Sequence, residues 1–246
     1  MKDNSSVQAK QYAKYRPTYP ASLYDFILSH VPVKEKAWDC ATGNGQVAGV
    51  LSKHFDSVYA TDISAAQINN AIVADNIFYK VEPAEETTFQ DNSFDLITVG
   101  QAIHWFDFDK FYNEATRTLK TGGIVVLLGY DLLRLTPALN KVICTFYNYI
   151  LGIYWDKERK YIDEQYKTLP FPFAEVNAPS FTISYEWEFD ELTGFFNTWS
   201  AVQHFIRINN YNPLDLVIDD FKEAWGPNKT HVVNFPLILR MGQVNK

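Results

Sequence analysis

Between residues 37 and 130, short apolar runs alternate with segments in which apolar residues recur every three or four positions. The runs are typical of strands buried on both faces, and they fall at 37–41, 58–60, 77–81, 94–99 and 124–128. The intervening segments have the spacing of amphipathic helices. Strands and helices that alternate in this way predict an α/β fold with a doubly wound, mostly parallel sheet and helices on both of its faces.

Beyond residue 130 this alternation stops. Residues 132–167 have helical spacing and many aromatic side chains, and the proline-rich stretch 169–173 predicts an extended connector, because proline disfavours a helix before it. Four later elements are expected, namely strands at 181–189 and 231–242 and helices at 192–206 and 214–225. The expected sheet therefore has seven strands.

The chain is expected to form a single domain, since 246 residues are within the range of one large domain. Its four consecutive parts are an N-terminal arm and helix (1–36), a core (37–130), a helical aromatic cap inserted after strand five (131–180), and the strands and helices that complete the sheet (181–246).

Composition excludes several classes of protein. Hydrophobic residues make up 47% of the chain and charged residues 21%, as in a globular protein rather than a disordered or fibrous one. No apolar run approaches the ~20 residues that cross a bilayer, so no membrane partner is expected. The net charge of -7 and the lack of a basic cluster argue against nucleic acid as a partner.

Cysteine and histidine usage indicates the compartment and argues against a metal site. The first residues lack the apolar run of a secretory signal, and two cysteines cannot build a disulfide framework, so we expect a cytoplasmic protein. Metal-ligand spacing is missing among the cysteines and His30, His54, His204 and His231. No metal is expected, and the pattern does not predict an oligomeric state.

The most informative stretch is the turn Gly43-Asn44-Gly45 between the first strand and the following helix. Glycines at such a turn let a ligand touch the backbone at the positive end of a helix. Asp62 ends the next strand, roughly 20 residues further on, where a carboxylate accepts both hydroxyls of a ribose. A tight turn alone would explain the glycines, but the turn and Asp62 in this register predict a nucleoside ligand.

The identity of that nucleoside is ambiguous from the glycines alone. Gly43, Gly45 and Ala48 also satisfy the dinucleotide pattern, which leaves a nicotinamide-dependent reductase as an alternative. Asp39, on the last turn of the strand, is poorly placed beside a pyrophosphate but well placed for an ammonium group, which S-adenosylmethionine carries. A non-catalytic protein that binds an adenosyl ligand is a further alternative, because a fold does not guarantee an activity.

Residues 38–46, Trp-Asp-Cys-Ala-Thr-Gly-Asn-Gly-Gln, resemble motif I of class I S-adenosylmethionine-dependent methyltransferases, a hydrophobic residue and Asp followed by Gly-x-Gly. The resemblance implies a Rossmann-like fold in which 37–130 is the cofactor-binding core. The implied contacts are Asp39, Gly43 and Gly45 for the methionine end, Asp62 for the ribose, Ala84 and Glu85 for the adenine side, and in addition Ala41, Ile63 and Gln101.

Residues 12–20 and 101–107 resemble a narrower branch, the small-molecule methyltransferases similar to trans-aconitate methyltransferase, and 198–200 and 239–242 echo its patterns. The implied substrate-binding residues are Tyr12, Tyr15, Arg16, His104 and Trp105. His104 and Trp105 follow the fourth strand at the edge where open sheets bind ligands, although a surface histidine and a core ring would also explain them. Arg16 could pair with a carboxylate of the substrate or of the methionine, or belong to a solvated arm.

The expected reaction is in-line displacement of a methyl group from a sulfonium onto an oxygen atom of a small molecule. A carboxylate acceptor, with a pKa near ~4, is ionised at pH 7 and needs no base. A hydroxyl acceptor would make His104 the candidate general base. Carbon and sulfur acceptors are alternatives, whereas the motif with which some families grip an amine or amide nitrogen is missing after the fourth strand.

Overall fold

The sheet of this protein, seen in a computed structural model that describes residues 15 and 17–246, has the order β3-β2-β1-β4-β5-β8-β6. Strand β7 pairs with β8 off this path. β1 to β5 pair in parallel, whereas β8 runs antiparallel to β5, β6 and β7. The strands are β1 Lys36–Cys40, β2 Ser57–Asp62, β3 Ile77–Val81, β4 Phe94–Gly100, β5 Leu119–Tyr130, β6 Ala174–Glu175, β7 Thr182–Glu188 and β8 Thr230–Gln243.

This arrangement confirms the predicted Rossmann-like α/β fold with its mostly parallel sheet. The seven expected strands all form, and the two-residue β6 is an addition to them. The first strand ends at Cys40 rather than at Ala41, because Ala41 has a φ of 53° and so leaves the extended region. The central β4 is buried at every position except its last, as expected of a strand covered on both faces.

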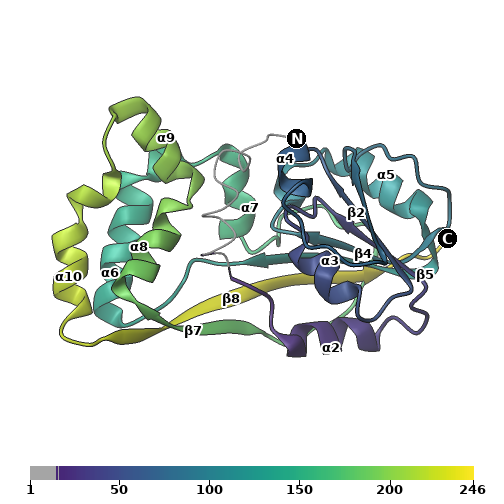
Figure 1. Cartoon of the computed structure of the whole chain (residues 1–246), viewed down its shortest axis with the longest axis horizontal. Helices are drawn as coiled ribbons and strands as arrows, with labels where there is room; N and C mark the ends of the chain where they lie inside the picture. Colours follow the sequence, from purple (N-terminus) through teal and green to yellow (C-terminus); the bar gives the residue numbers. More distant parts are fainter. Residues whose placement is uncertain (1–14, 16) are drawn as a thin grey trace.

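Helices cover both faces of the sheet (Figure 1). On one face α5 (Phe108–Thr118) buries Phe111 beside Trp38 of β1. On the other face α2 (Ala21–Ser29) and α3 (Gln46–Leu51) bury their apolar residues against the sheet. A four-residue helix, α4 (Ala65–Ile68), follows β2. None of the helices in the described part of the chain is long and apolar enough to cross a bilayer.

A helical lobe stands beyond one end of the sheet, at the left of Figure 1. Its core is aromatic and includes the fully buried rings of Phe146, Phe196 and Phe221. The elements between β5 and β8 that belong to it or connect it are α6 Pro137–Thr145, η3 Phe146–Ile150, η4 Gly152–Tyr154, η5 Lys157–Arg159, α7 Lys160–Asp163, α8 Phe189–Asn197, α9 Ser200–Asn209, η6 Pro213–Leu216 and α10 Ile218–Trp225.

The lobe takes more of the chain than the expected cap. Helix α10 packs on α6 and helix α9 packs on η4, so helices that were expected to complete the sheet extend the cap instead. The expected helix 192–206 is two helices, because the Thr198 hydroxyl donates to the Phe195 carbonyl at 2.6 Å and Trp199 takes an extended backbone. The expected helix 132–167 forms only in part, because α6 continues into the π-helical η3 and is followed by the short turns η4 and η5 and the four-residue α7.

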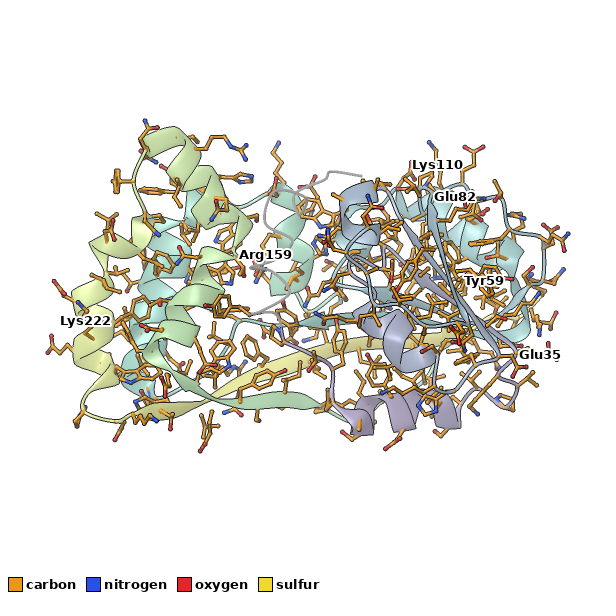
Figure 2. The ribbon with its side chains drawn as sticks, in the orientation of Figure 1. Glu35, Tyr59, Glu82, Lys110, Arg159 and Lys222 are labelled. Carbon is orange, nitrogen blue, oxygen red and sulfur yellow. The ribbon has the colours of Figure 1, made fainter. Side chains whose placement is uncertain are left out.

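Strand β8 joins the lobe to the core. Its residues 230–236 pair with β7 and its residues 237–243 pair with β5, so one continuous strand belongs to both parts. Because β8 runs antiparallel to β5, the half of β8 that pairs with β7 extends beyond the carboxyl end of β5, toward the lobe. Figure 2 shows Arg159 between the lobe helices and the sheet.

Candidate active site

The turn after β1 has three residues with left-handed backbone, Ala41, Gly43 and Gly45, with φ of 53°, 57° and 79°. A Cβ added to Gly43 would meet no atom within 4 Å, so this glycine borders open space. A Cβ added to Gly45 would collide with the hydroxyl of Tyr79 on β3. Only Gly43 therefore leaves room for a ligand, whereas Gly45 is required by a contact within the protein.

Asp39 stabilises this turn through hydrogen bonds to its carboxylate. Its side chain accepts hydrogen bonds from the Thr42 hydroxyl at 2.5 Å, the Ala48 amide at 3.1 Å and the Thr98 hydroxyl at 2.8 Å. Burial raises the pKa of Asp39 to about 6, because the loss of solvation outweighs these hydrogen bonds, which favour the ionised form. A carboxylate has about four acceptor positions, so one remains for a cation.

Asp62 links the ends of two strands. Its Oδ2 accepts from the Gly43 amide at 2.9 Å and its Oδ1 from the Ser64 amide at 2.8 Å. Ser64 in turn caps α4 through its hydroxyl. The carboxylate expected to bind a ribose is thus held beside Gly43 of the glycine turn.

The remaining expected cofactor residues lie along the same strand edge. Gln101 follows β4 with a φ of 56°, and its buried Nε2 has no hydrogen-bond partner within the described residues. Glu85 accepts from the Asp107 amide at 3.2 Å, which joins the loop after β3 to the loop after β4. Ala84 is buried and Ile63 is half-buried.

This set fits S-adenosylmethionine in its chemistry. Gly43 borders open space, the Asp62 carboxylate lies beside it with the kind of acceptor oxygens that ribose hydroxyls need, and Asp39 keeps one acceptor position beside the turn. The unsatisfied amide of Gln101 is a donor that a bound ligand would satisfy. Among the described residues, no group of three or more His, Cys, Asp and Glu side chains is arranged to hold a metal ion.

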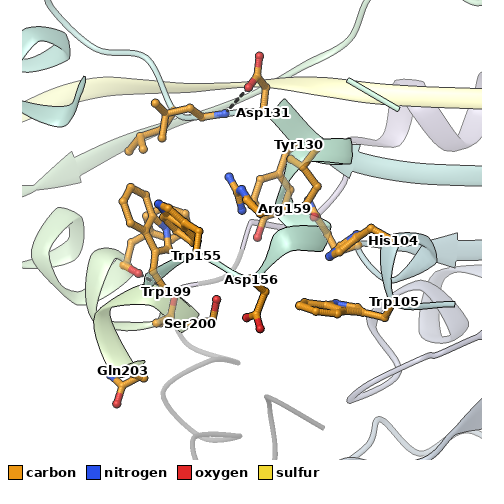
Figure 3. Close-up of a pocket in the computed structure, with 16 residues that line it drawn as sticks. His104, Trp105, Tyr130, Asp131, Trp155, Asp156, Arg159, Trp199, Ser200 and Gln203 are labelled. Atoms are coloured by element: carbon orange, nitrogen blue, oxygen red, sulfur yellow. Dashed lines mark hydrogen bonds between the residues drawn. The ribbon is translucent and has the colours of Figure 1, made fainter. Parts of the chain in front are cut away.

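A cavity that is partly open to solvent lies between the core and the lobe. Figure 3 shows His104 and Trp105 on its core side, opposite Trp155 and Trp199 of the lobe. The aromatic walls are Trp105, Tyr130, Trp155, Phe195 and Trp199. The polar groups are Gln101, His104, Asp131, Asp156, Arg159, Thr198, Ser200 and Gln203.

Arg159 is the one arginine or lysine among the described residues that line this cavity. Its Nε donates to the Tyr147 hydroxyl at 2.9 Å and lies 3.5 Å from Asp163, and its guanidinium lies 4.8 Å from the centre of the Trp155 ring. Its Nη1 and Nη2 have no hydrogen bond to any residue that the structure describes. The nearby Asp131 is already paired with Gln165 and Arg134. Arg159 therefore has donors for a ligand.

The substrate residues expected from the sequence have different outcomes. His104 and Trp105 lie together in the cavity wall, with ring centres 4.8 Å apart. Tyr15 packs against the aromatic core of the lobe, and its ring covers Gly194 of α8. Tyr12 and Arg16 fall outside the described residues. The stretch Thr198-Trp199-Ser200, which echoes a family pattern, lines the same cavity.

Several cavity residues were not identified from the sequence, namely Trp155, Asp156 and Arg159. They stand together directly after the aromatic run of the cap. Charged residues that follow an aromatic run can indicate a binding site. Which way their side chains point, however, depends on turns η4 and η5, and such short turns leave no periodic pattern in the sequence. The sequence therefore could not distinguish them from a solvated surface.

Comparison with known proteins identifies the class. A model of the methyltransferase domain matches residues 38–127. The chain is 32% identical over 239 residues to a Dictyostelium discoideum protein described as a methyltransferase, and the match covers 94% of this chain and 91% of the relative. A solved protein from Anaeromyxobacter dehalogenans, described as a type II methyltransferase, is 34% identical with a TM-score of 0.87, and the match covers 94% of this chain and 100% of that one.

A more distant structure shares the fold alone. Phosphoethanolamine N-methyltransferase 2 of Haemonchus contortus, solved in complex with S-adenosyl-L-methionine, is 17% identical with a TM-score of 0.50, and the match covers 98% of this chain and 58% of that one.

Fold and glycine turn together define a class I S-adenosylmethionine-dependent methyltransferase, and the chain belongs to the methyltransferase family. Membership in this family confirms the predicted cofactor, S-adenosylmethionine. This membership decides against the nicotinamide-dependent reductase and the non-catalytic binding protein, which the glycine turn alone left as alternatives.

Proposed function

We propose that this enzyme methylates an oxygen atom, a carboxylate or a hydroxyl, of a small acidic molecule bound between the core and the lobe. The observation that carries the proposal is the placement of Arg159, with two nitrogens that the described residues leave unsatisfied, in an aromatic cavity that His104 also lines. An apolar cavity with a few polar anchors is typical of small-molecule sites. The likeness to the trans-aconitate methyltransferase branch is part of this proposal.

The chain contributes alignment and exclusion of water. S-adenosylmethionine supplies, when bound, a methyl group on a sulfonium, which is a good leaving group. Arg159 would hold the acid group of the substrate, as guanidinium donors fit a carboxylate. The rings of Trp105, Trp155 and Trp199 would hold the rest of the molecule and keep water from the reacting atoms.

An ionised carboxylate acceptor needs no base, whereas a hydroxyl acceptor requires that a proton be taken up. His104 is the histidine on the core side of the cavity, so it is the side chain that would take up this proton. Both acceptors therefore belong to the proposal at this point.

The partner class and the compartment are also proposed. A net charge of -7 disfavours nucleic acid, which supports a small-molecule substrate. Cys40 and Cys144 are both free thiols, which supports a reducing, cytoplasmic environment.

Methylation of a metabolite extract with isotopically labelled cofactor tests the proposal. The labelled product is expected to come from an acceptor retained by an anion-exchange resin, and mass spectrometry is expected to locate the methyl group on oxygen. The control is the Asp62→Ala variant, which should transfer little label. A label on nitrogen, or on a macromolecule, would overturn the proposal.

A further inference from the structure

Tyr166 is a fully buried tyrosine behind His104. It follows α7 in the loop to β6, and its hydroxyl lies 3.5 Å from Nδ1 of His104. This distance is longer than an ordinary hydrogen bond, and hydrogen bonds of active sites are often long until substrate binds. Tyr166 does not line the cavity, so it acts on the substrate only through the imidazole.

The chain holds Tyr166 in place with several contacts. Gln165 and Tyr166 both have left-handed backbone, with φ of 55° and 58°, a conformation that persists in consecutive non-glycine residues only when the surroundings enforce it. Nη1 of Arg240 donates to the Tyr166 carbonyl at 3.1 Å and to the Leu169 carbonyl at 2.8 Å. Glu175 binds the other nitrogens of Arg240, at 2.7 and 3.1 Å.

The neighbouring strand makes room for the ring. A Cβ on Gly129 of β5 would lie 3.1 Å from the Tyr166 side chain, closer than ordinary contact. Arg240 belongs to residues 239–242 of β8, which echo a family pattern but are not among the expected cofactor-binding residues. The Tyr166 hydroxyl is therefore held beside His104 by three features: the left-handed backbone, the hydrogen bonds from Arg240 and the space left by Gly129.

The direction of the hydrogen bond follows from what the hydroxyl can reach. Burial raises the pKa of Tyr166 above its ordinary value, so the hydroxyl keeps its proton. Nδ1 of His104 is the sole hydrogen-bond partner of that hydroxyl within residues 15 and 17–246. If the imidazole donated instead, a buried O–H would be left without an acceptor, which is the costlier arrangement.

We propose that Tyr166 is a positioning residue that donates to Nδ1 and so fixes neutral His104 in the tautomer with its proton on Nε2. In this form His104 donates a hydrogen bond from Nε2 and does not remove a proton there. Resting on the proposed function, this makes His104 a donor to an acceptor group that arrives already ionised, and it selects the carboxylate over the hydroxyl.

The tautomer is measurable in the free enzyme by nitrogen-15 NMR of labelled histidine. The protein has five histidines, and His104→Gln assigns the signal of interest. We expect wild-type His104 above its protonation range to show a bare Nδ1 and a protonated Nε2. In Tyr166→Phe, which keeps the ring and removes the hydroxyl, we expect the two tautomers to mix.

The matched control is Tyr112→Phe, since the Tyr112 hydroxyl is also buried but has no hydrogen-bond partner among the described side chains. It should leave the His104 signals unchanged. Wild-type His104 with its proton on Nδ1 would overturn the proposal, even if Tyr166→Phe failed to fold. So would the same tautomer in Tyr166→Phe as in wild type.

Turnover gives a second, independent readout once an acceptor is known. A donor role predicts that His104→Gln, whose amide can donate, stays within about tenfold of wild-type kcat/KM, while His104→Ala loses roughly 10- to 100-fold. A general base predicts equal, larger losses in both variants. If no acceptor is methylated on oxygen, the proposed function fails while the tautomer result still stands on its own.

Discussion

The amide of Gly43 donates a hydrogen bond to Oδ2 of Asp62 over 2.9 Å, which ties the turn after β1 to the end of β2. The residue that faces open space and the carboxylate expected at the ribose are therefore one unit. A ligand that binds here contacts a backbone turn and a carboxylate that are already in position, so binding requires little further ordering of the protein.

Replacing Asp62 should weaken cofactor binding. Asp62→Ala is expected to reduce S-adenosylmethionine affinity by roughly 1 to 3 kcal/mol, because ribose hydroxyls and the Gly43 amide lose their acceptor. Titration calorimetry on the folded variant measures this. Asp56→Ala, which removes an exposed carboxylate just before the same strand, should bind normally; unchanged binding in Asp62→Ala would contradict the assignment.

Replacing the two glycines of the turn by alanine should affect different properties of the protein. Alanine at either position is strained by about 1 to 2 kcal/mol because of the positive φ. Gly45→Ala should lose further stability, since its Cβ displaces the Tyr79 hydroxyl from the Ile72 carbonyl, to which it donates at 2.6 Å. Gly43→Ala should instead lose mainly cofactor affinity.

A double variant separates these two effects. Tyr79→Phe combined with Gly45→Ala should recover part of the stability lost by Gly45→Ala, measured by denaturant unfolding, because the colliding oxygen is gone. The same tyrosine change should not help Gly43→Ala. Equal rescue of both variants would show that the Tyr79 hydroxyl is not what makes Gly45 necessary.

Cofactor binding should depend on pH through Asp39. Its pKa of about 6 is raised by burial, and a nearby ammonium favours the ionised form, so binding lowers this pKa. Affinity is therefore full above pH 6 and falls as the pH is lowered through about 6, where binding releases a proton. Calorimetry in buffers of different ionisation heat measures that proton.

The matched ligand for this test is methylthioadenosine, which has the nucleoside but no ammonium group. It should bind without releasing a proton near pH 6. If S-adenosylmethionine also released none, Asp39 would not be the partner of the ammonium.

Arg159 should determine the preference for an acidic acceptor. Arg159→Gln is expected to lower kcat/KM for such an acceptor by roughly 10- to 100-fold, the effect of losing hydrogen bonds from a charged group. Arg207→Gln, a change at an exposed arginine of α9, is the control and should have little effect. An unaffected Arg159→Gln enzyme would remove the cavity from consideration as the substrate site.

The sequence by itself determined the cofactor half of this enzyme. The buried strands are short, mostly apolar runs, and Asp39, Gly43 and Gly45 lie within a few residues of one another. Such signals are local, because a strand period or a left-handed turn is specified by neighbouring residues. Asp62 could be added because parallel strands that are adjacent in sequence end at the same edge.

Only the tertiary structure brought together the residues of the proposed substrate cavity. His104, Arg159 and Trp199 meet in one cavity although they lie in the core and in two separate parts of the lobe. Nothing local links Tyr166 to His104, 62 residues away, or to Arg240, 74 residues away. These contacts depend on how β8 joins the lobe to the sheet and on aromatic packing, both of which are set by long-range burial rather than by any periodicity along the chain.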